Sequence, residues 1–171
     1  MKRFIVAMFM VLALPISVLA ADGSKFASVD VQKVLLMSDA GKAAKEQLGQ
    51  RAGKYEAEKA SREGELKKLK GELESQGTVL NDSARSAKER DYQQHLKEYQ
   101  RFLKEAQEDL QGKNDELTSR IVEEIAKVVQ DYGRKNGYTA IFVKNETMIY
   151  LDPTADVTDE ILKAYNATRQ Q

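Results

Sequence analysis

Two runs of residues with alternating four- and three-residue spacing constrain this 171-residue chain more than any other feature. The first run occupies positions 48, 52, 55, 59, 62, 66, 69, 73, 76 and 80, and seven of these ten residues are apolar. The second run begins at Tyr92 and continues through positions 96, 99, 103, 106, 110, 113 and 117. This spacing is typical of the seam of a coiled coil, in which each helix buries one narrow stripe. The first seam is weakest at Lys59 and Arg62.

A segment of turn-forming residues separates the two seams. Residues 75–83 contain Gly77, Asn81 and Asp82, which favour turns and helix N-caps. Two seams of similar length that are joined by one turn predict an antiparallel helical hairpin over residues 38–120. At 1.5 Å per residue, its first helix would be a rod of roughly 65 Å.

The segments on either side of this hairpin predict a small β-containing body. Residues 25–31 alternate as in a strand, and residues 121–132 carry an apolar face wider than a seam. Residues 138–143 and 147–151 predict a β-hairpin that turns at Asn145 and Glu146, and a short helix follows from Thr158. The expected fold class is therefore α+β: a long antiparallel α-helical hairpin, or coiled-coil arm, on a small β body formed by residues 21–37 and 121–171.

Three short strands and one short helix outside the arm are too few to bury a large core in a single chain. We therefore expect oligomerisation through sheet edges. The candidates for an intersubunit body are the apolar residues of these strands and of the widened helix face: Val29, Val31, Ile125, Val128, Ile141, Val143 and Ile149.

The first twenty residues predict a secretory signal peptide. Lys2 and Arg3 precede an unbroken apolar run, and the small residue Ala20 marks the expected cleavage site, there or one residue later. The alternative is an uncleaved N-terminal anchor, which the short apolar run does not favour. Cleavage leaves 25 basic against 27 acidic residues, a formal net charge of −2. The mature protein is thus expected to be exported and nearly neutral.

The composition excludes most active-site chemistry. The chain has no cysteine and one histidine, His95, so disulfides, thiolate metal sites and histidine-based triads are not expected. Near-neutral charge argues against a general nucleic-acid binder. We therefore predict no enzyme activity, no catalytic or metal-binding residues and no cofactor.

Four stretches of sequence resemble the OmpH/Skp family of periplasmic chaperones, over essentially the whole mature chain. They read ASVDVQKVL, LNDSARSAKERDYQQHLKEYQRFLKEAQEDL, KNGYTAIFV and DPTADVTDEILKAYN, in that order. The resemblance implies a three-armed homotrimer in which strands of three subunits form the body and the hairpins surround a cavity. It also implies an ATP-independent holdase that binds unfolded outer-membrane proteins in that cavity.

The outer part of the arm is rich in basic residues. Between positions 67 and 104 nine bases face six acids, which would give three arms about +9 together. This charge could serve client binding or transient contact with a membrane surface, or it could be an ordinary solvated surface. Whether lipopolysaccharide is bound stays open. The nine candidates are Lys67, Lys68, Lys70, Arg85, Lys88, Arg90, Lys97, Arg101 and Lys104.

Two further questions stay open at the level of sequence. The helix glycines Gly49, Gly53, Gly64 and Gly71 could let the arm bend around clients of different size, or they could be neutral on a solvated face. The function itself has an alternative, a structural coiled-coil spacer or envelope-associated scaffold without client binding, although a spacer does not explain the strands at both ends of the arm.

Overall fold

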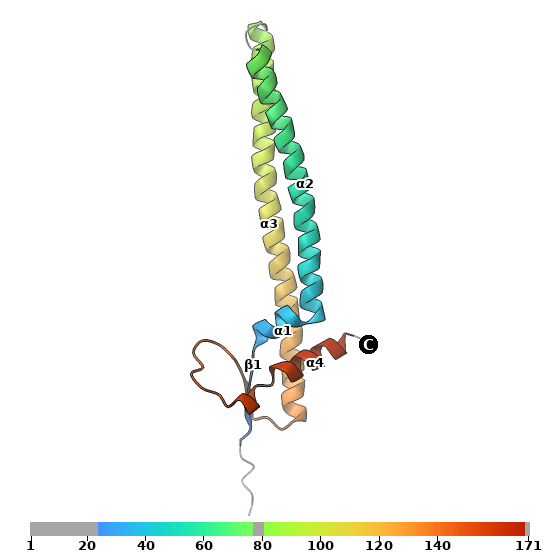
Figure 1. The fold of residues 1–171 in the computed structure, drawn as a ribbon, viewed down its shortest axis with the longest axis vertical. Helices are drawn as coiled ribbons and strands as arrows, with labels where there is room; N and C mark the ends of the chain where they lie inside the picture. Colours follow the sequence, from blue (N-terminus) through green and yellow to red (C-terminus); the bar gives the residue numbers. More distant parts are fainter. Residues whose placement is uncertain (1–23, 77–80, 170–171) are drawn as a thin grey trace, which may run out of the picture.

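The computed structural model describes residues 24–76 and 81–169, so the predicted signal peptide lies outside the described residues. A long helical hairpin rises from a small base that holds both ends of the described chain (Figure 1). The elements are, in order, β1 (Phe26–Val29), α1 (Val31–Met37), α2 (Asp39–Gln76), α3 (Asp82–Lys135), β2 (Ala140–Val143), the 3-10 helix η1 (Pro153–Ala155) and α4 (Thr158–Thr168).

The predicted antiparallel hairpin is confirmed in α2 and α3, which form the arm. Each α2 seam position from 48 to 73 is half-buried, while most of its neighbours are exposed. The 38 residues of α2 correspond to a rod of about 57 Å. Helix α3 begins where turn chemistry was expected, because the Asn81 side chain caps it by accepting the N–H of Ala84 at 2.9 Å.

The seam of α3 differs from the predicted one at its centre. Leu103, a predicted seam residue, is 37% exposed, whereas the preceding residue Phe102 is only 8% exposed. The physical reason is the larger ring of Phe102, which contacts the ring of Tyr55 edge-on at a centroid distance of 6.0 Å. Phe102 therefore faces α2, and Leu103 is turned to one flank of the seam.

Helices α1 and α2 meet at a sharp corner rather than forming one continuous helix. The Ser38 hydroxyl donates to the Leu35 carbonyl and accepts the N–H of Gly41, both at 3.1 Å. A Cβ atom on Gly41 would lie 1.7 Å from the Leu35 carbonyl oxygen. The corner therefore requires glycine at position 41.

The sheet has two parallel strands among the described residues, and the whole arm is the connection between them. Phe26 to Val29 of β1 pair in register with Ala140 to Val143 of β2. On the other side of β1, Ser28 forms an isolated bridge with Asp156. Strand β1 thus lies between β2 and the segment that leads into α4.

The predicted C-terminal β-hairpin is wrong, because residues 147–151 form no strand. A tight two-residue hairpin turn requires positive φ at its central residues, and no non-glycine residue of the described chain has one. Instead, the Asn145 side chain accepts the backbone N–H of Thr147 at 3.0 Å and its hydroxyl at 2.6 Å. This turn leads the chain into an irregular loop, and β2 pairs with β1 instead.

The main cluster of buried apolar side chains lies at the base. It is built from β1, both sides of the α1–α2 corner, the last third of α3, and α4. Its largest fully buried side chains include Tyr165, Ile125 and Ile161. The predicted helix begins at Thr158, and the Thr158 hydroxyl accepts the backbone N–H of Asp30 at 2.9 Å.

Candidate functional site

One flank of the arm is lined mostly by charged side chains, around a hollow of about 380 Å³. Arg51 on α2 forms a two-pronged ion pair with Asp109 on α3, and the Tyr55 hydroxyl donates to the same carboxylate at 2.8 Å. The hydrogen bonds from Arg51 and then from Tyr55 lower the pKa of Asp109 below its ordinary value. The carboxylate therefore stays ionised and holds the two helices together.

The two charged residues at the expected weak point of the α2 seam lie on different flanks, Arg62 on this flank and Lys59 on the other. The Arg62 guanidinium lies over the ring of Phe102, 4.7 Å from the ring centroid, and it also pairs with Glu58. Lys59 is half-buried and pairs with Glu56 at 3.4 Å. Arg62 thus packs against the seam through its flat cation, a role that its charge conceals in the sequence.

The opposite flank of the arm is open and mostly apolar. A groove of about 600 Å³ runs between α2 and α3 on this side. Leu103 lies in it, because Phe102 has taken the place in the seam. We call this feature the arm groove, and its remaining lining residues are Leu48, Gly49, Ala52, Tyr55, Glu56, Lys59, Phe102, Ala106, Gln107, Leu110, Gln111 and Asn114.

The nine predicted basic side chains differ in their ion pairing. Five of them form ion pairs: Lys70 with Glu74, Arg85 with Glu89, Lys88 with Glu72, Arg101 with Glu105 and Lys104 with Glu108. Glu105 and Glu108 lie outside residues 67–104, the segment for which nine bases and six acids were counted. Pairing with them reduces the excess of positive charge on the outer arm. Four bases have no ion-pair partner within the described part of the chain: Lys67, Lys68, Arg90 and Lys97.

The residues expected in an intersubunit body fall into two groups. Val143 is 56% exposed and Ile149 is fully exposed. The other five are buried in the chain's own core or packed against it, and they are Val29, Val31, Ile125, Val128 and Ile141. A single chain therefore already uses most of these residues for its own stability.

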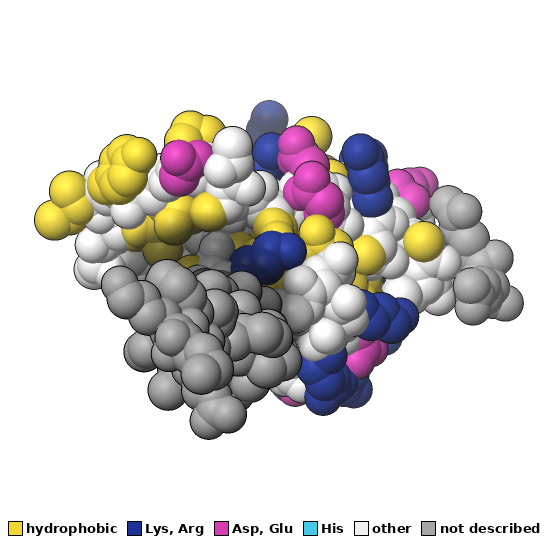
Figure 2. Space-filling view, turned by 90° about the horizontal axis from the view of Figure 1, so that it is seen from below, with side chains coloured by type: hydrophobic (Ala, Val, Ile, Leu, Met, Phe, Trp, Pro, Cys, Tyr) yellow, Lys and Arg dark blue, Asp and Glu magenta, His cyan; other side chains and the backbone are white. Residues whose placement is uncertain are grey.

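An apolar surface remains at the base of the molecule. Phe26 and Phe142 are about half exposed and their rings lie 6.1 Å apart, while Tyr150 is 80% exposed. Seen from below, hydrophobic side chains gather toward one side of this end (Figure 2). Val143 and Ile149 are also exposed at this end, so the exposed apolar side chains of β1, β2 and the loop after β2 are Phe26, Phe142, Val143, Ile149 and Tyr150. We call this surface the basal patch.

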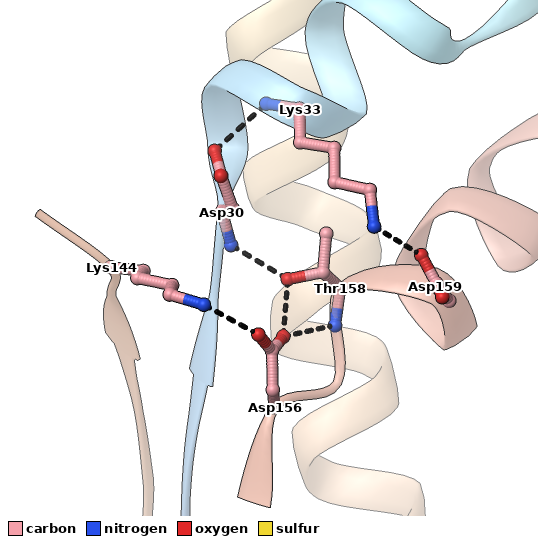
Figure 3. Close-up of polar contacts among 6 residues, drawn as sticks. All are labelled: Asp30, Lys33, Lys144, Asp156, Thr158 and Asp159. Atoms are coloured by element: carbon pink, nitrogen blue, oxygen red, sulfur yellow. Dashed lines mark hydrogen bonds and ion pairs between the residues drawn. The ribbon is translucent and has the colours of Figure 1, made fainter. Parts of the chain in front are cut away.

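A polar network fastens the C-terminal segment to the start of the chain (Figure 3). Asp156 accepts the N–H and the hydroxyl of Thr158, and it pairs with Lys144 at 2.9 Å. Burial opposes the ionised form, but the bonds from Thr158 and Lys144 outweigh it and lower the pKa of Asp156 to about 2. A second pair, Lys33 with Asp159 at 2.8 Å, ties α1 to α4. The sequence analysis missed this network, although Asp-x-Thr before a helix is a known turn motif.

Glu124 takes part in a second contact that sequence reasoning did not find. Its carboxylate accepts the hydroxyl of the buried Tyr165 at 2.6 Å and pairs with Arg169 at 2.8 Å. Burial, together with the bond to Glu124, raises the pKa of Tyr165 to about 12. These bonds anchor α4 against α3.

The described residues contain no cluster of side chains able to hold a metal ion. The His95 nitrogens lie 3.9 Å from a Glu65 oxygen and 3.7 Å from an Asp91 oxygen, on the surface of the outer arm. No helix in the described ranges is both long enough and apolar enough to span a membrane. The arm groove and the basal patch are therefore the two surfaces that we consider for function.

Comparisons with known proteins match this architecture. Residues 25–165 match the family model of OmpH-like outer membrane proteins. A solved structure from Caulobacter crescentus, described as a candidate OmpH-like outer membrane chaperone, has a TM-score of 0.79 and 18% sequence identity, with 85% of each chain covered. No curated protein matches the sequence. The likeness to the solved structure shows a common fold, and the family model covers both the arm and the body, so the chain belongs to the OmpH-like outer membrane protein family.

Proposed function

We propose that this protein is an ATP-independent holdase chaperone of the periplasm. In this proposal it binds unfolded outer-membrane proteins between helical arms and prevents their aggregation on the way to the outer membrane. The match to the OmpH-like family and the fold shared with a solved structure described as an OmpH-like outer membrane chaperone support this proposal. The observation that carries the proposal is the arm, in which α2 and the outer two thirds of α3 bury only a narrow seam and leave most of their surface for contact with another molecule.

We further propose that three copies assemble through the basal patch. Strand β2 pairs with β1 on one side only within the described residues, and next to its unpaired edge the loop carries the fully exposed Ile149. Burying such an edge and its apolar residues in a partner would remove an aggregation hazard. Three arms held at one end could then surround a cavity. Export and cleavage after about Ala20 belong to the same proposal.

The four bases without ion-pair partners suit the outer arm for transient electrostatic contact. Lys67, Lys68, Arg90 and Lys97 could attract acidic segments of a client or an anionic membrane surface. Such contacts are weak individually, so repetition on three arms would supply the strength of binding. We do not expect nucleic acid as a partner.

Light scattering of the mature protein, with and without a urea-denatured outer-membrane barrel protein, tests this function. We expect a species of three times the chain mass that keeps the barrel protein in solution without nucleotide. A monomer that leaves the barrel protein to aggregate would refute the holdase and favour a coiled-coil spacer or scaffold. An Ile149→Asp variant should be a monomer, because the substitution places a charge in the proposed interface between subunits.

A further inference from the structure

The two flanks of the arm differ in a way that the family assignment does not predict. Helical spacing places Arg51, Glu58 and Arg62 on one side of the α2 seam, and Gly49 on the other side. We propose that the arm groove, on the open flank, is the site that binds extended segments of the unfolded client. This inference rests on the proposed holdase function and specifies the face of the arm on which it acts.

The lining of the arm groove supplies apolar contact without closing over the ligand. Leu48 and Leu110 are half-buried and Leu103 is 37% exposed, so these side chains retain area that a client can cover. The small residues Gly49 and Ala52 on α2 leave room for a chain to approach closely. A Cβ built on Gly49 meets no atom within 4 Å.

A row of amide side chains along α3 borders the groove and fits an extended polypeptide. Gln107, Gln111 and Asn114 line it, and carboxamides both donate and accept hydrogen bonds. Gln111 donates to Asp115 at 2.8 Å along its own helix, which leaves its carbonyl oxygen available to a ligand N–H. Such groups can satisfy the free N–H and C=O groups of any unpaired backbone, whatever the client sequence.

The dimensions of the groove agree with the repeat of a β-strand. Gln107 and Gln111 are four residues apart, a rise of about 6 Å, while side chains on one face of an extended chain repeat every 6.4 to 6.8 Å or so. The α2 lining from Leu48 to Lys59 rises about 17 Å, enough for roughly five extended residues. Strands of outer-membrane barrels alternate apolar and polar residues. One face of such a segment would enter the groove while its other face stays in water.

The charged flank is a poor competitor for the same segment. An apolar side chain placed there would have to displace water from the ion pair of Arg51 and Asp109, and it would enter a hollow in which six of the nine lining residues are charged. The same pair holds the helices at the spacing that keeps the other flank open. We therefore assign client binding to one flank, and the closing of the hairpin to the other.

The absence of cysteine from the chain permits a direct test with matched labels. Gly49→Cys places a thiol in the groove, and Gly53→Cys places one a turn away, outside the lining. Both glycines are exposed and a Cβ at either meets nothing within 4 Å, so both variants should fold. Each is labelled with a solvatochromic fluorophore and mixed with a urea-denatured barrel protein, while light scattering reports whether that protein stays in solution.

Each outcome decides the proposal. A client kept in solution, with a blue shift and protection from aqueous quencher at position 49 but not at 53, supports it. A client kept in solution with equal responses at the two positions refutes the groove and leaves the holdase function standing. Protection at position 49 before any client is added refutes client binding in the groove, because another copy of the chain would then already cover the groove. A client that aggregates refutes the holdase function and the groove with it.

A second measurement tests the energetics of the groove. Leu103→Gln keeps the length of the side chain and removes its apolar surface, so we expect client affinity to fall about tenfold with an unchanged thermal midpoint. Lys54→Gln, an exposed α2 position outside the groove, is the control and should bind as the parent does. Equal affinities of the Leu103→Gln variant and the parent would contradict the proposal.

Discussion

The arm and the body of this protein are stabilised by different kinds of contact. The arm is a repeat of local helix turns and one interhelical seam, in which Phe102, Ala106 and Leu117 are the buried apolar residues short of the base. The body joins residues that are far apart in the chain, for example Asp30 and Thr158, which are 128 positions apart. The arm can therefore change shape or lose a contact at small cost, while the body depends on a few residues that fix its geometry.

The largest expected effect comes from truncating the core of the body. Ile125 is fully buried, so Ile125→Ala should cost about 2–5 kcal/mol of unfolding free energy by leaving a cavity. The corresponding truncation in the arm, Leu69→Ala, shortens a half-buried side chain and should lower the unfolding free energy by about 1 kcal/mol. Urea denaturation followed by circular dichroism measures both. Equal losses would mean that arm and body do not differ in the way described.

The second prediction uses one substitution with opposite effects in the two regions. Gly41→Ala pushes a methyl group against the Leu35 carbonyl oxygen at the α1–α2 corner, and should destabilise by about 3 kcal/mol. Gly53→Ala in the arm meets no neighbour within 4 Å and should stabilise its helix by about 1 kcal/mol. Thermal melts of both variants test the contrast, and a neutral Gly41→Ala would show that the corner can relax.

The same glycines decide between the two interpretations of the arm that the sequence left open. The structure gives no steric reason for Gly49, Gly53, Gly64 or Gly71, since a Cβ at each would meet open space. Gly53, Gly64 and Gly71 lie outside the arm groove, so replacing these three with Ala changes backbone stiffness and leaves the groove lining intact. If clients of different sizes are then held less well, bending is part of the function, and if holding is unchanged, the glycines are neutral.

The third prediction concerns the pH dependence of the body. The folded pKa of Asp156 is about 2, below its ordinary value of 3.8, so its ionised form contributes about 2 kcal/mol to stability. This contribution is complete above about pH 4 and disappears as the pH falls from there toward 2. Asp156→Asn should thus lose about 2 kcal/mol at neutral pH and show a flatter dependence between pH 4 and 2.

Denaturation of both proteins at neutral pH and across the acid range is the measurement. The control is Asp152→Asn, whose carboxyl is exposed and bonds to Thr154 within η1 only, and which should lose less. A parent protein that keeps its full stability at pH 2 would contradict the role of Asp156 in fastening the C-terminal segment. Acid should also loosen the arm, since the pKa of Asp109 is lowered as well.

The arm could be predicted from sequence far better than the body, for a physical reason. A coiled-coil seam depends on spacing along one helix, which sequence displays directly. Even there the choice between Phe102 and Leu103 depended on Tyr55 and Arg62 of the other helix. The open flank, and with it the arm groove, follows from that choice and was not visible in the spacing.

The body depends on contacts that sequence spacing does not encode. The expected β-hairpin at Asn145 failed because β1, over a hundred residues earlier, pairs with β2 and because Asn145 bonds to Thr147. The need for Gly41 comes from the approach of Leu35 at a corner. The assignment of Val143 and Ile149 to an intersubunit surface stays a prediction, although their exposure is what it requires.

The smallest expected effect separates two buried hydroxyl groups within the body. The Ser28 hydroxyl is buried and has no hydrogen-bond partner among the described residues, so Ser28→Ala should leave stability unchanged or raise it by up to about 1 kcal/mol. Thr158→Val, by contrast, removes the acceptor for the Asp30 N–H and one donor to Asp156, and should cost about 1–3 kcal/mol. Urea denaturation compares the two. A clear loss in Ser28→Ala would show that this hydroxyl has a partner that the described residues do not supply, such as an enclosed water molecule.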